Sequence, residues 1–180
     1  MEYRRVRIKG GTYFFTVITY RKRKIFRDPE NIELLRNAFR RVLKLYPFKI
    51  DAFILMPDHL HCIWTLPQGD SDYPTRWRLI KTLFTKNCKD RYKLPPSTSR
   101  AKKKEQAIWH RRYWEHLIRD QEDFRKHVEY IHYDPVKHGW ARIPLEWKYS
   151  SFHRYVRNGL YDESWGAGME IHFDEDIGYE

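Results

Sequence analysis

The amino-acid sequence predicts an α+β fold in which helices pack on one or both faces of an antiparallel sheet. Apolar runs and helical periodicities alternate in the order strand, helix, strand, strand, helix, strand, helix, and no internal repeat is visible. The 180 residues suffice for one domain with an ordinary core. We expect this domain in residues 1–160, followed by an acidic tail in residues 161–180.

The first half of the chain predicts three strands and a helix. Residues 12–20 are β-branched and aromatic and follow two glycines, which indicates a strand. Apolar residues then recur at helical spacing between Asp28, a suitable N-cap, and Pro47, which marks the helix end. Residues 48–56 and 60–66 are apolar runs separated by a Pro-Asp turn, which indicates a hairpin. We expect the second of these strands to lie in the centre of the sheet.

The second half predicts a helix, a loop, a strand and a final helix. Residues 77–87 have helical periodicity with basic residues on another face, whereas residues 93–106 are rich in Pro, Ser and Lys and indicate a mobile loop. Residues 108–118 alternate loosely and favour a strand. Asp120 is a suitable N-cap for a helix that we expect to continue to Tyr133, before a proline and a glycine.

Composition excludes several classes of protein. No stretch approaches the roughly 20 apolar residues of a membrane span, and the N-terminus lacks a signal-peptide pattern. The only cysteines are Cys62 and Cys88, without paired C-x-x-C spacing, so we expect neither a disulfide scaffold nor a zinc finger. We therefore expect a reduced, intracellular protein.

The charge distribution points to a polyanionic partner. The chain holds 35 Lys and Arg against 24 Asp and Glu, a net charge of +11, yet its last twenty residues hold seven acids and no Lys or Arg. Residues 1–160 therefore carry +18 (35 basic against 17 acidic residues). Aromatic residues make up 17% of the chain and suit stacking on unpaired bases. The alternative is an aromatic core beneath a solvated basic surface.

Two histidines at the start of a predicted strand form the first candidate site. His59 and His61 are two residues apart, so their imidazoles project to one face of the strand and could hold a divalent metal. The apolar residues that follow make this an unfavourable place for two polar rings unless something binds them. A hydrogen-bonded pair at the surface is the alternative.

The second candidate site lies on the final predicted helix. Tyr130 and Asp134 are four residues apart and share a flank outside the apolar stripe. The two histidines and one oxygen ligand could hold a metal, and a tyrosine hydroxyl beside that metal could attack a phosphodiester. Alternatively the tyrosine only donates a hydrogen bond to the carboxylate, and Tyr133 is a rival nucleophile by proximity.

Several segments together resemble the REP-associated tyrosine transposases, a branch of the single-tyrosine HUH endonucleases. The resemblance lies in YRRVRIKGGTYFFTV, PDHLHCIWTLP, YWEHLIRD, VEYIHYDPVKHGW and YSSFHRYVRNGLY, which occur in family order. It covers about residues 3–166 without most of the lysine-rich loop and the acidic end. It implies a ferredoxin-like core of the HUH-endonuclease type.

The resemblance also implies roles for four residues. His59 and His61 would bind the catalytic metal, Mg²⁺ or Mn²⁺, and Tyr130 would attack single-stranded DNA. The third metal ligand of this branch is an asparagine, and the matching residue here is Asp134. A carboxylate oxygen suits these metals as well as an amide oxygen does, so we expect activity to be retained.

The implied reaction is metal-dependent cleavage and strand transfer of single-stranded DNA through a 5′-phosphotyrosine, which leaves a free 3′-hydroxyl and needs no nucleotide cofactor. The implied partner is hairpin DNA of repetitive extragenic palindromes. We expect a cytoplasmic, nucleoid-associated monomer or homodimer. The residues expected to contact DNA are the basic N-terminal residues, the glycine turn and one face of the second helix: Arg4, Arg5, Arg7, Lys9, Gly10, Gly11, Arg76, Arg78 and Lys81.

Two other functions remain open from the residues alone. One is a nucleic-acid-binding protein without chemistry, in which Tyr130 stacks on a base. The other is a metal-dependent nuclease that activates water, with Asp134 as ligand or base. The acidic tail could fold over the DNA channel and compete with substrate, or be a disordered, solvated end.

Overall fold

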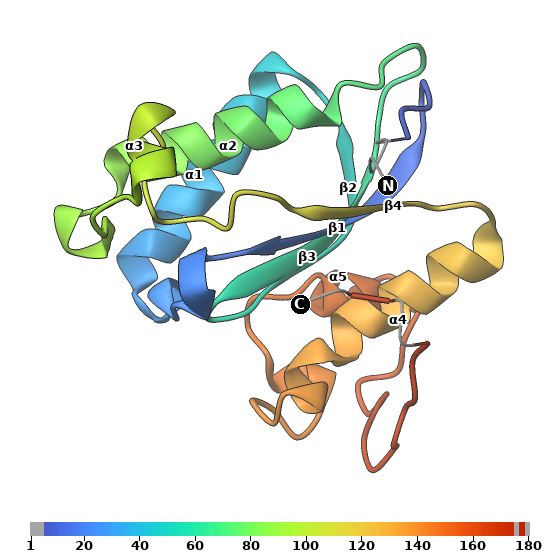
Figure 1. The fold of residues 1–180 in the computed structure, drawn as a ribbon. Helices are drawn as coiled ribbons and strands as arrows, with labels where there is room; N and C mark the ends of the chain where they lie inside the picture. The colour runs from blue at the N-terminus through green and yellow to red at the C-terminus, as the bar shows by residue number, and fades with distance from the viewer. Residues whose placement is uncertain (1–5, 175–176, 179–180) are drawn as a thin grey trace.

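The computed structural model describes residues 6–174 and 177–178, and in it four strands form one antiparallel sheet (Figure 1). The strands are β1 (Thr12–Ile18), β2 (Lys49–Leu55), β3 (His59–Thr65) and β4 (Trp114–Leu117), in the spatial order β2-β3-β1-β4. The predicted central place of β3 is confirmed. This strand order, with helices joining β1 to β2 and β3 to β4, is the ferredoxin-like arrangement that the family resemblance implies.

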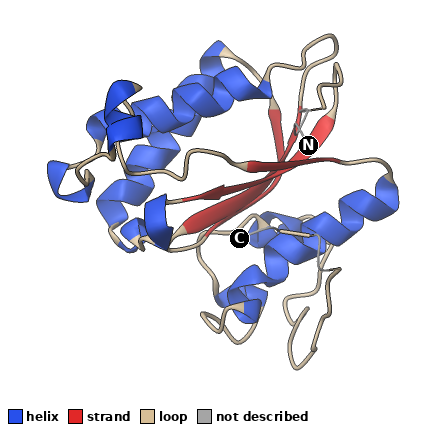
Figure 2. Cartoon of the chain, viewed as in Figure 1, coloured by secondary structure: helices blue, strands red, loops and turns tan. Residues whose placement is uncertain are grey.

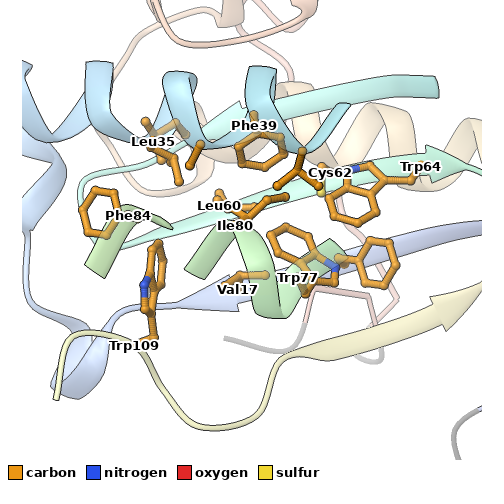
Figure 3. Packing of buried hydrophobic residues seen from close by; sticks show 14 of the residues in the cluster. Val17, Leu35, Phe39, Leu60, Cys62, Trp64, Trp77, Ile80, Phe84 and Trp109 are labelled. Carbon is orange, nitrogen blue, oxygen red and sulfur yellow. The ribbon is translucent and has the colours of Figure 1, made fainter. Parts of the chain in front are cut away.

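Helices α1 (Pro29–Leu45) and α2 (Tyr73–Asn87) cover one face of the sheet (Figure 1). Both begin with an aspartate side chain that accepts a backbone N–H and a proline in the first turn. The cap of α1, Asp28, is the predicted one, whereas α2 begins at Tyr73, earlier than the predicted start at residue 77. Between helices and sheet lies the larger core, in which the Trp64 and Trp77 rings stack 4.2 Å apart and Phe39, Leu60 and Phe84 fill the neighbouring space (Figure 3).

Helices α4 (Gln121–Lys137) and α5 (Phe152–Arg157) lie on the opposite face (Figures 1 and 2). A smaller core here joins Phe14, Ile54 and Ile63 of the sheet to Val128 and Ile131 of α4. Successive side chains of a strand point to opposite faces of the sheet, so every second residue of β1 and β3 points to this face. The helix with the candidate tyrosine therefore lies over the strand with the candidate histidines.

The segment predicted as a mobile loop is partly ordered by burial. It contains α3 (Thr98–Lys102), and the backbone of Leu94 pairs with that of Ala107. The reason is Arg100, which is buried and donates hydrogen bonds to the carbonyl oxygens of Gln106 and Trp109. The prediction of an irregular segment was therefore wrong for these residues.

The last strand is shorter than predicted. Ile108 and Trp109 are buried in the larger core. Before β4, the only β-bridge found in residues 108–113 pairs Trp109 with Thr19, the residue after β1. Its aromatic content thus reflects burial of side chains and not a continuous ladder. Short 3₁₀ helices complete the chain: Tyr20–Lys22, Ile25–Arg27, Asp90–Tyr92 and Pro144–Glu146.

Helix α4 continues past the predicted end at Tyr133 and includes Pro135. Proline removes one helical hydrogen bond, but this part of α4 is buried against the sheet, and packing supplies the stability that the backbone loses. The helix ends where Gly139 adopts φ +69°, and the backbone N–H groups of Trp140 and Ala141 both donate to the Pro135 carbonyl. In the described part of the chain, no helix is long and apolar enough to cross a bilayer.

Candidate active site

The two histidines of β3 point to the face covered by α4. His61 lies opposite Thr16 of β1, and the Thr16 hydroxyl oxygen is 2.9 Å from Nδ1 of His61. Nδ1 of His59 lies 2.7 Å from a carboxylate oxygen of Asp58. Each ring thus has one nitrogen in a hydrogen bond to a neighbour, which orients the other nitrogen, the arrangement usual for imidazoles that bind metals.

Helix α4 brings a carboxylate and a phenol to these nitrogens. Oδ2 of Asp134 lies 3.2 Å from Nε2 of His59, and its Oδ1 lies 3.9 Å from Nε2 of His61. The Tyr130 ring centre is 5.3 Å from that of His61. Because Tyr130 and Asp134 are one helical turn apart, both reach the sheet at the same place. The structure therefore brings together all four residues that the sequence indicated.

The donor set of this cluster suits a divalent cation. His59, His61 and Asp134 are all buried, and each offers a ligand atom within 4.8 Å of the others. Two imidazole nitrogens and a carboxylate oxygen form a common set for transition metals and leave coordination positions for substrate or water. These three residues could hold a metal.

The carboxylate of this cluster is ionised. Burial alone would raise the pKa of Asp134, but hydrogen bonds from His138 and His59 and the proximity of His61 lower this pKa well below its ordinary value. Burial raises the pKa of Asp58, but its hydrogen bond and charge interaction with His59, a backbone hydrogen bond and the proximity of His138 together lower this pKa below its ordinary value. Both carboxylates can therefore serve as anionic partners of the histidines or of a cation.

Two residues of the site were not predicted from the sequence. Nε2 of His138 lies 3.3 Å from Oδ1 of Asp134, and Nζ of Lys137 donates a hydrogen bond of 2.8 Å to the Tyr130 hydroxyl. The Lys137 ammonium also lies 4.7 Å from the centre of the Tyr130 ring. Their helical spacing was a usable signal, since Lys137 follows Tyr130 by two turns and His138 follows Asp134 by one.

The described part of the C-terminal tail lies on the candidate nucleophile. Tyr130 is only 1% exposed, and its hydroxyl donates to the carbonyl oxygen of Gly178. The Phe173 ring meets the Tyr130 ring edge-on at 5.2 Å, and Asp174 forms an ion pair with Lys126. These tail residues pack on the protein, so the tail covers the phenol.

The rival tyrosine is oriented differently. The Tyr133 hydroxyl donates to the carbonyl oxygen of Met169, and its ring packs against Trp165 and Phe173. It thus faces the C-terminal segment, whereas Tyr130 faces His61. This orientation favours Tyr130 over Tyr133 as the nucleophile.

The N-terminal residues predicted to contact DNA are only partly described. Arg4 and Arg5 lie outside the described residues, whereas Arg7 and Lys9 are exposed. The turn at Gly10 requires glycine because its φ is +68°. A β-carbon at Gly11 would come within 2.9 Å of both the Tyr13 ring and the Ile8 carbonyl oxygen, so packing within the protein also accounts for this glycine.

On α2 the three predicted contacts differ. Arg78 is exposed, and the Lys81 ammonium lies over the rings of Trp109 and Tyr113. Arg76 is a correction: it is 2% exposed, forms an ion pair with Asp70, and donates to the carbonyl oxygens of Tyr46, Pro47 and Asp72. Its guanidinium is thus occupied within the protein and stabilises the fold.

Comparison with known proteins agrees with this geometry. Residues 8–134 match the family described as "Transposase IS200 like". A REP-associated tyrosine transposase of Escherichia coli (strain K12) is 44% identical over 168 residues, which cover 93% of this chain and 92% of the relative. A putative REP-associated tyrosine transposase of Haemophilus influenzae is 40% identical over 180 residues, with 98% and 99% covered.

A solved structure of a REP-associated tyrosine transposase bound to a REP hairpin superimposes with a TM-score of 0.81 at 40% identity, and the match covers 100% of this chain and 98% of that one. The match thus covers the whole chain, including the strand that carries His59 and His61 and the helix that carries Tyr130. This chain belongs to the IS200-like transposase family and is a tyrosine transposase of its REP-associated branch.

Proposed function

We propose that this transposase cleaves and rejoins single-stranded DNA beside a palindromic hairpin, with Tyr130 as the nucleophile and a divalent cation, Mg²⁺ or Mn²⁺, held by His59, His61 and Asp134. The observation that carries the proposal is the position of the Tyr130 ring, 5.3 Å from the His61 ring and one helical turn from Asp134. A nucleophile and a potential metal-binding group thus meet in one buried site.

The cation supplies, when bound, polarisation of the scissile phosphate and compensation of the negative charge that develops on it. The ligands are held by their own neighbours, because Asp58 orients His59 and Thr16 orients His61. The Asp134 carboxylate replaces the amide of related proteins and adds a negative charge that a cation would offset.

Lys137 assists the nucleophile. An unperturbed tyrosine has a pKa near 10 and is neutral at pH 7, so attack requires loss of its proton. The Lys137 ammonium, 2.8 Å from the phenolic oxygen, stabilises the negative charge that forms there. The oxygen–phosphorus bond to Tyr130 then forms as the bond from phosphorus to the 3′-oxygen breaks, and that oxygen takes up a proton. The phosphotyrosine conserves the bond energy for rejoining.

Charge and exposure support a DNA substrate at this site. Residues 1–160 carry +18, and Arg7, Lys9 and Arg78 are exposed. A related transposase of 40% identity was solved with a REP hairpin, and we extend that class of partner to this chain. A substrate on the chromosome implies a cytoplasmic, nucleoid-associated protein. The tail over Tyr130 must move before a DNA strand can reach the phenol.

The test is a denaturing gel of end-labelled single-stranded DNA that contains palindromes from the flanks of the gene. With Mg²⁺ or Mn²⁺ the wild-type protein should form a covalent adduct that EDTA abolishes. The Tyr130→Phe variant should bind the DNA without an adduct, whereas the matched control Tyr133→Phe should form it. Cleavage without an adduct, retained in Tyr130→Phe, would instead indicate a nuclease that activates water, and binding without cleavage would indicate a binding protein.

A further inference from the structure

Helix α4 with its C-cap residue contains the same pair of residue types twice. An aspartate is followed four residues later by a histidine at Asp123 and His127, and again at Asp134 and His138. The two pairs are 11 residues apart, which is three helical turns to within about 20°. Both aspartates therefore face the sheet, about 16 Å apart along the helix at 1.5 Å per residue.

Each aspartate contacts one or two histidines of the strand beneath it. Asp134 meets His59 and His61 of β3, and Asp123 meets His116 of β4. His116 lies opposite Phe14 of β1, on the sheet face that α4 covers. The candidate ligands His59, His61 and Asp134 and the group around Asp123 thus each comprise two histidines and one aspartate.

The geometry of the second group is compact. Nε2 of His116 lies 2.9 and 3.1 Å from the two carboxylate oxygens of Asp123, and Nδ1 of His127 lies 3.1 Å from one of them. The rings of His116 and His127 stack with centres 4.5 Å apart. The three residues offer ligand atoms that all lie within 4.8 Å of one another, and Asp123 and His127 are buried.

A cavity of about 240 Å³ opens beside this group. Asp120 and Asp174 also line it, together with Arg119 and Lys126. His116 is 26% exposed at its side chain, which gives a small ion a path from solvent. Arg119 donates to Asp123 through both its backbone N–H and its side chain. The side chain is 72% exposed and can withdraw when a cation takes its place, whereas the backbone hydrogen bond is retained.

We propose that His116, Asp123 and His127 form a second metal site, which binds Zn²⁺ or a similar transition metal and is separate from the site of Tyr130. Two imidazoles and one carboxylate are a frequent zinc-binding set, and they leave a fourth position for water or a further carboxylate. A metal on Nδ1 of His127 would replace the contact of this nitrogen with the backbone oxygen of Asp123, which lies 2.8 Å away.

The charge state of the group suits a cation. Burial would raise the pKa of Asp123, but hydrogen bonds from His116 and Arg119 lower it to about 2. The carboxylate is thus ionised at neutral pH.

The position of this site suggests a mechanical role. A metal here ties the edge strand β4 to the N-terminal half of α4, and Tyr130 lies one turn beyond His127. The Phe14 ring contacts the rings of His127, His61 and Tyr130, with centres 4.8, 5.5 and 6.2 Å away. Occupancy would therefore fix the helix that positions the nucleophile.

The test measures bound Zn²⁺ and Co²⁺ in the full-length protein. In a His59→Ala/His61→Ala variant, which lacks two ligands of the first site, one equivalent of Zn²⁺ should still bind. Co²⁺ in that variant should give the visible absorption of a tetrahedral site with nitrogen ligands. A further His116→Ala substitution should weaken binding at least tenfold, whereas His110→Ala, on a histidine outside both groups, should leave it unchanged.

Circular dichroism and thermal unfolding establish that each variant is folded. If His116→Ala does not fold, His127→Gln replaces it, and the metal content of wild type then decides: two equivalents of Zn²⁺ support the second site and one overturns it. Failure of the double histidine variant to bind Zn²⁺, or equal binding with and without His116, would refute the proposal. Loss of DNA cleavage in that double variant bears on the first site alone, so the two proposals fail independently.

Discussion

Replacing Lys137 by methionine should slow cleavage without weakening DNA binding. The substitution keeps the length of the side chain and removes the ammonium that donates a 2.8 Å hydrogen bond to the Tyr130 hydroxyl. A hydrogen bond to a charged group contributes about 1.5–3 kcal/mol, or roughly 10- to 150-fold in rate if it is made in the transition state. Because Lys137 is exposed, screening by water favours the lower end, about tenfold.

The assay is single-turnover formation of the covalent adduct at saturating DNA, which separates the chemical step from binding. Lys137→Arg keeps a cationic donor and should recover most of the rate. Lys44→Met removes a comparable charge from α1, on the opposite face of the sheet, and should leave the rate unchanged. A Lys137→Met rate within twofold of wild type, or an equal loss in Lys44→Met, would refute this role of Lys137.

Three further predictions concern the tail, the third ligand and a buried histidine. A β-carbon at Gly178 would lie 2.1 Å from the Tyr130 ring, so Gly178→Ala, or a chain that ends at Glu170, should displace the tail and raise the adduct-formation rate; an unchanged rate would show that the tail does not obstruct the phenol. Asp134→Asn should retain cleavage on the same gel, because an amide oxygen can ligate, whereas Asp134→Ala should abolish it. Burial lowers the pKa of His132 from 6.5 to about 3, so its neutral form stabilises the fold above about pH 6.5. Urea titrations should show the free energy of unfolding falling by up to about 1.4 kcal/mol per pH unit between pH 6.5 and 3, with a shallower slope in His132→Asn; equal slopes would contradict the assignment.

The sequence was sufficient for elements that depend on local pattern. The period-2 alternation placed His59 and His61 on one strand face, and the one-turn spacing placed Tyr130 and Asp134 together on a helix. The capping aspartates, such as Asp28, also marked helix starts correctly. These features follow from the backbone geometry of single elements, so they need no knowledge of the tertiary structure.

Tertiary contacts account for what the sequence did not reveal. Arg76 is basic and lies on an amphipathic helix, but a nearby aspartate and three carbonyl oxygens bind its guanidinium, which a reading of helical periodicity does not show. Arg100 orders a segment whose composition indicates a loop, through carbonyl oxygens that follow it in the chain. Pro135 remains within α4 because burial outweighs one lost hydrogen bond.

The arrangement around the nucleophile was partly accessible. The i to i+7 spacing of Tyr130 and Lys137 is visible in the sequence, whereas the contact of Gly178 with Tyr130 spans 48 positions and depends on the path of the tail after α5. Charge alone suggested that the tail could cover the DNA channel. In the structure Phe173 packs against Tyr130, so aromatic packing holds the tail there in addition to the ion pair between Lys126 and Asp174.

The identity of the nucleophile is the central claim, and peptide mapping of the covalent adduct tests it most directly. The protein would be incubated with single-stranded palindrome DNA and Mn²⁺, digested with nuclease and trypsin, and analysed by mass spectrometry. We expect the mass of a deoxynucleotide 5′-phosphate on the tryptic peptide that contains Tyr130, with fragment ions that place it on this tyrosine and not on Tyr133. A nucleotide on Tyr133, or cleaved DNA with no modified peptide, would contradict the account.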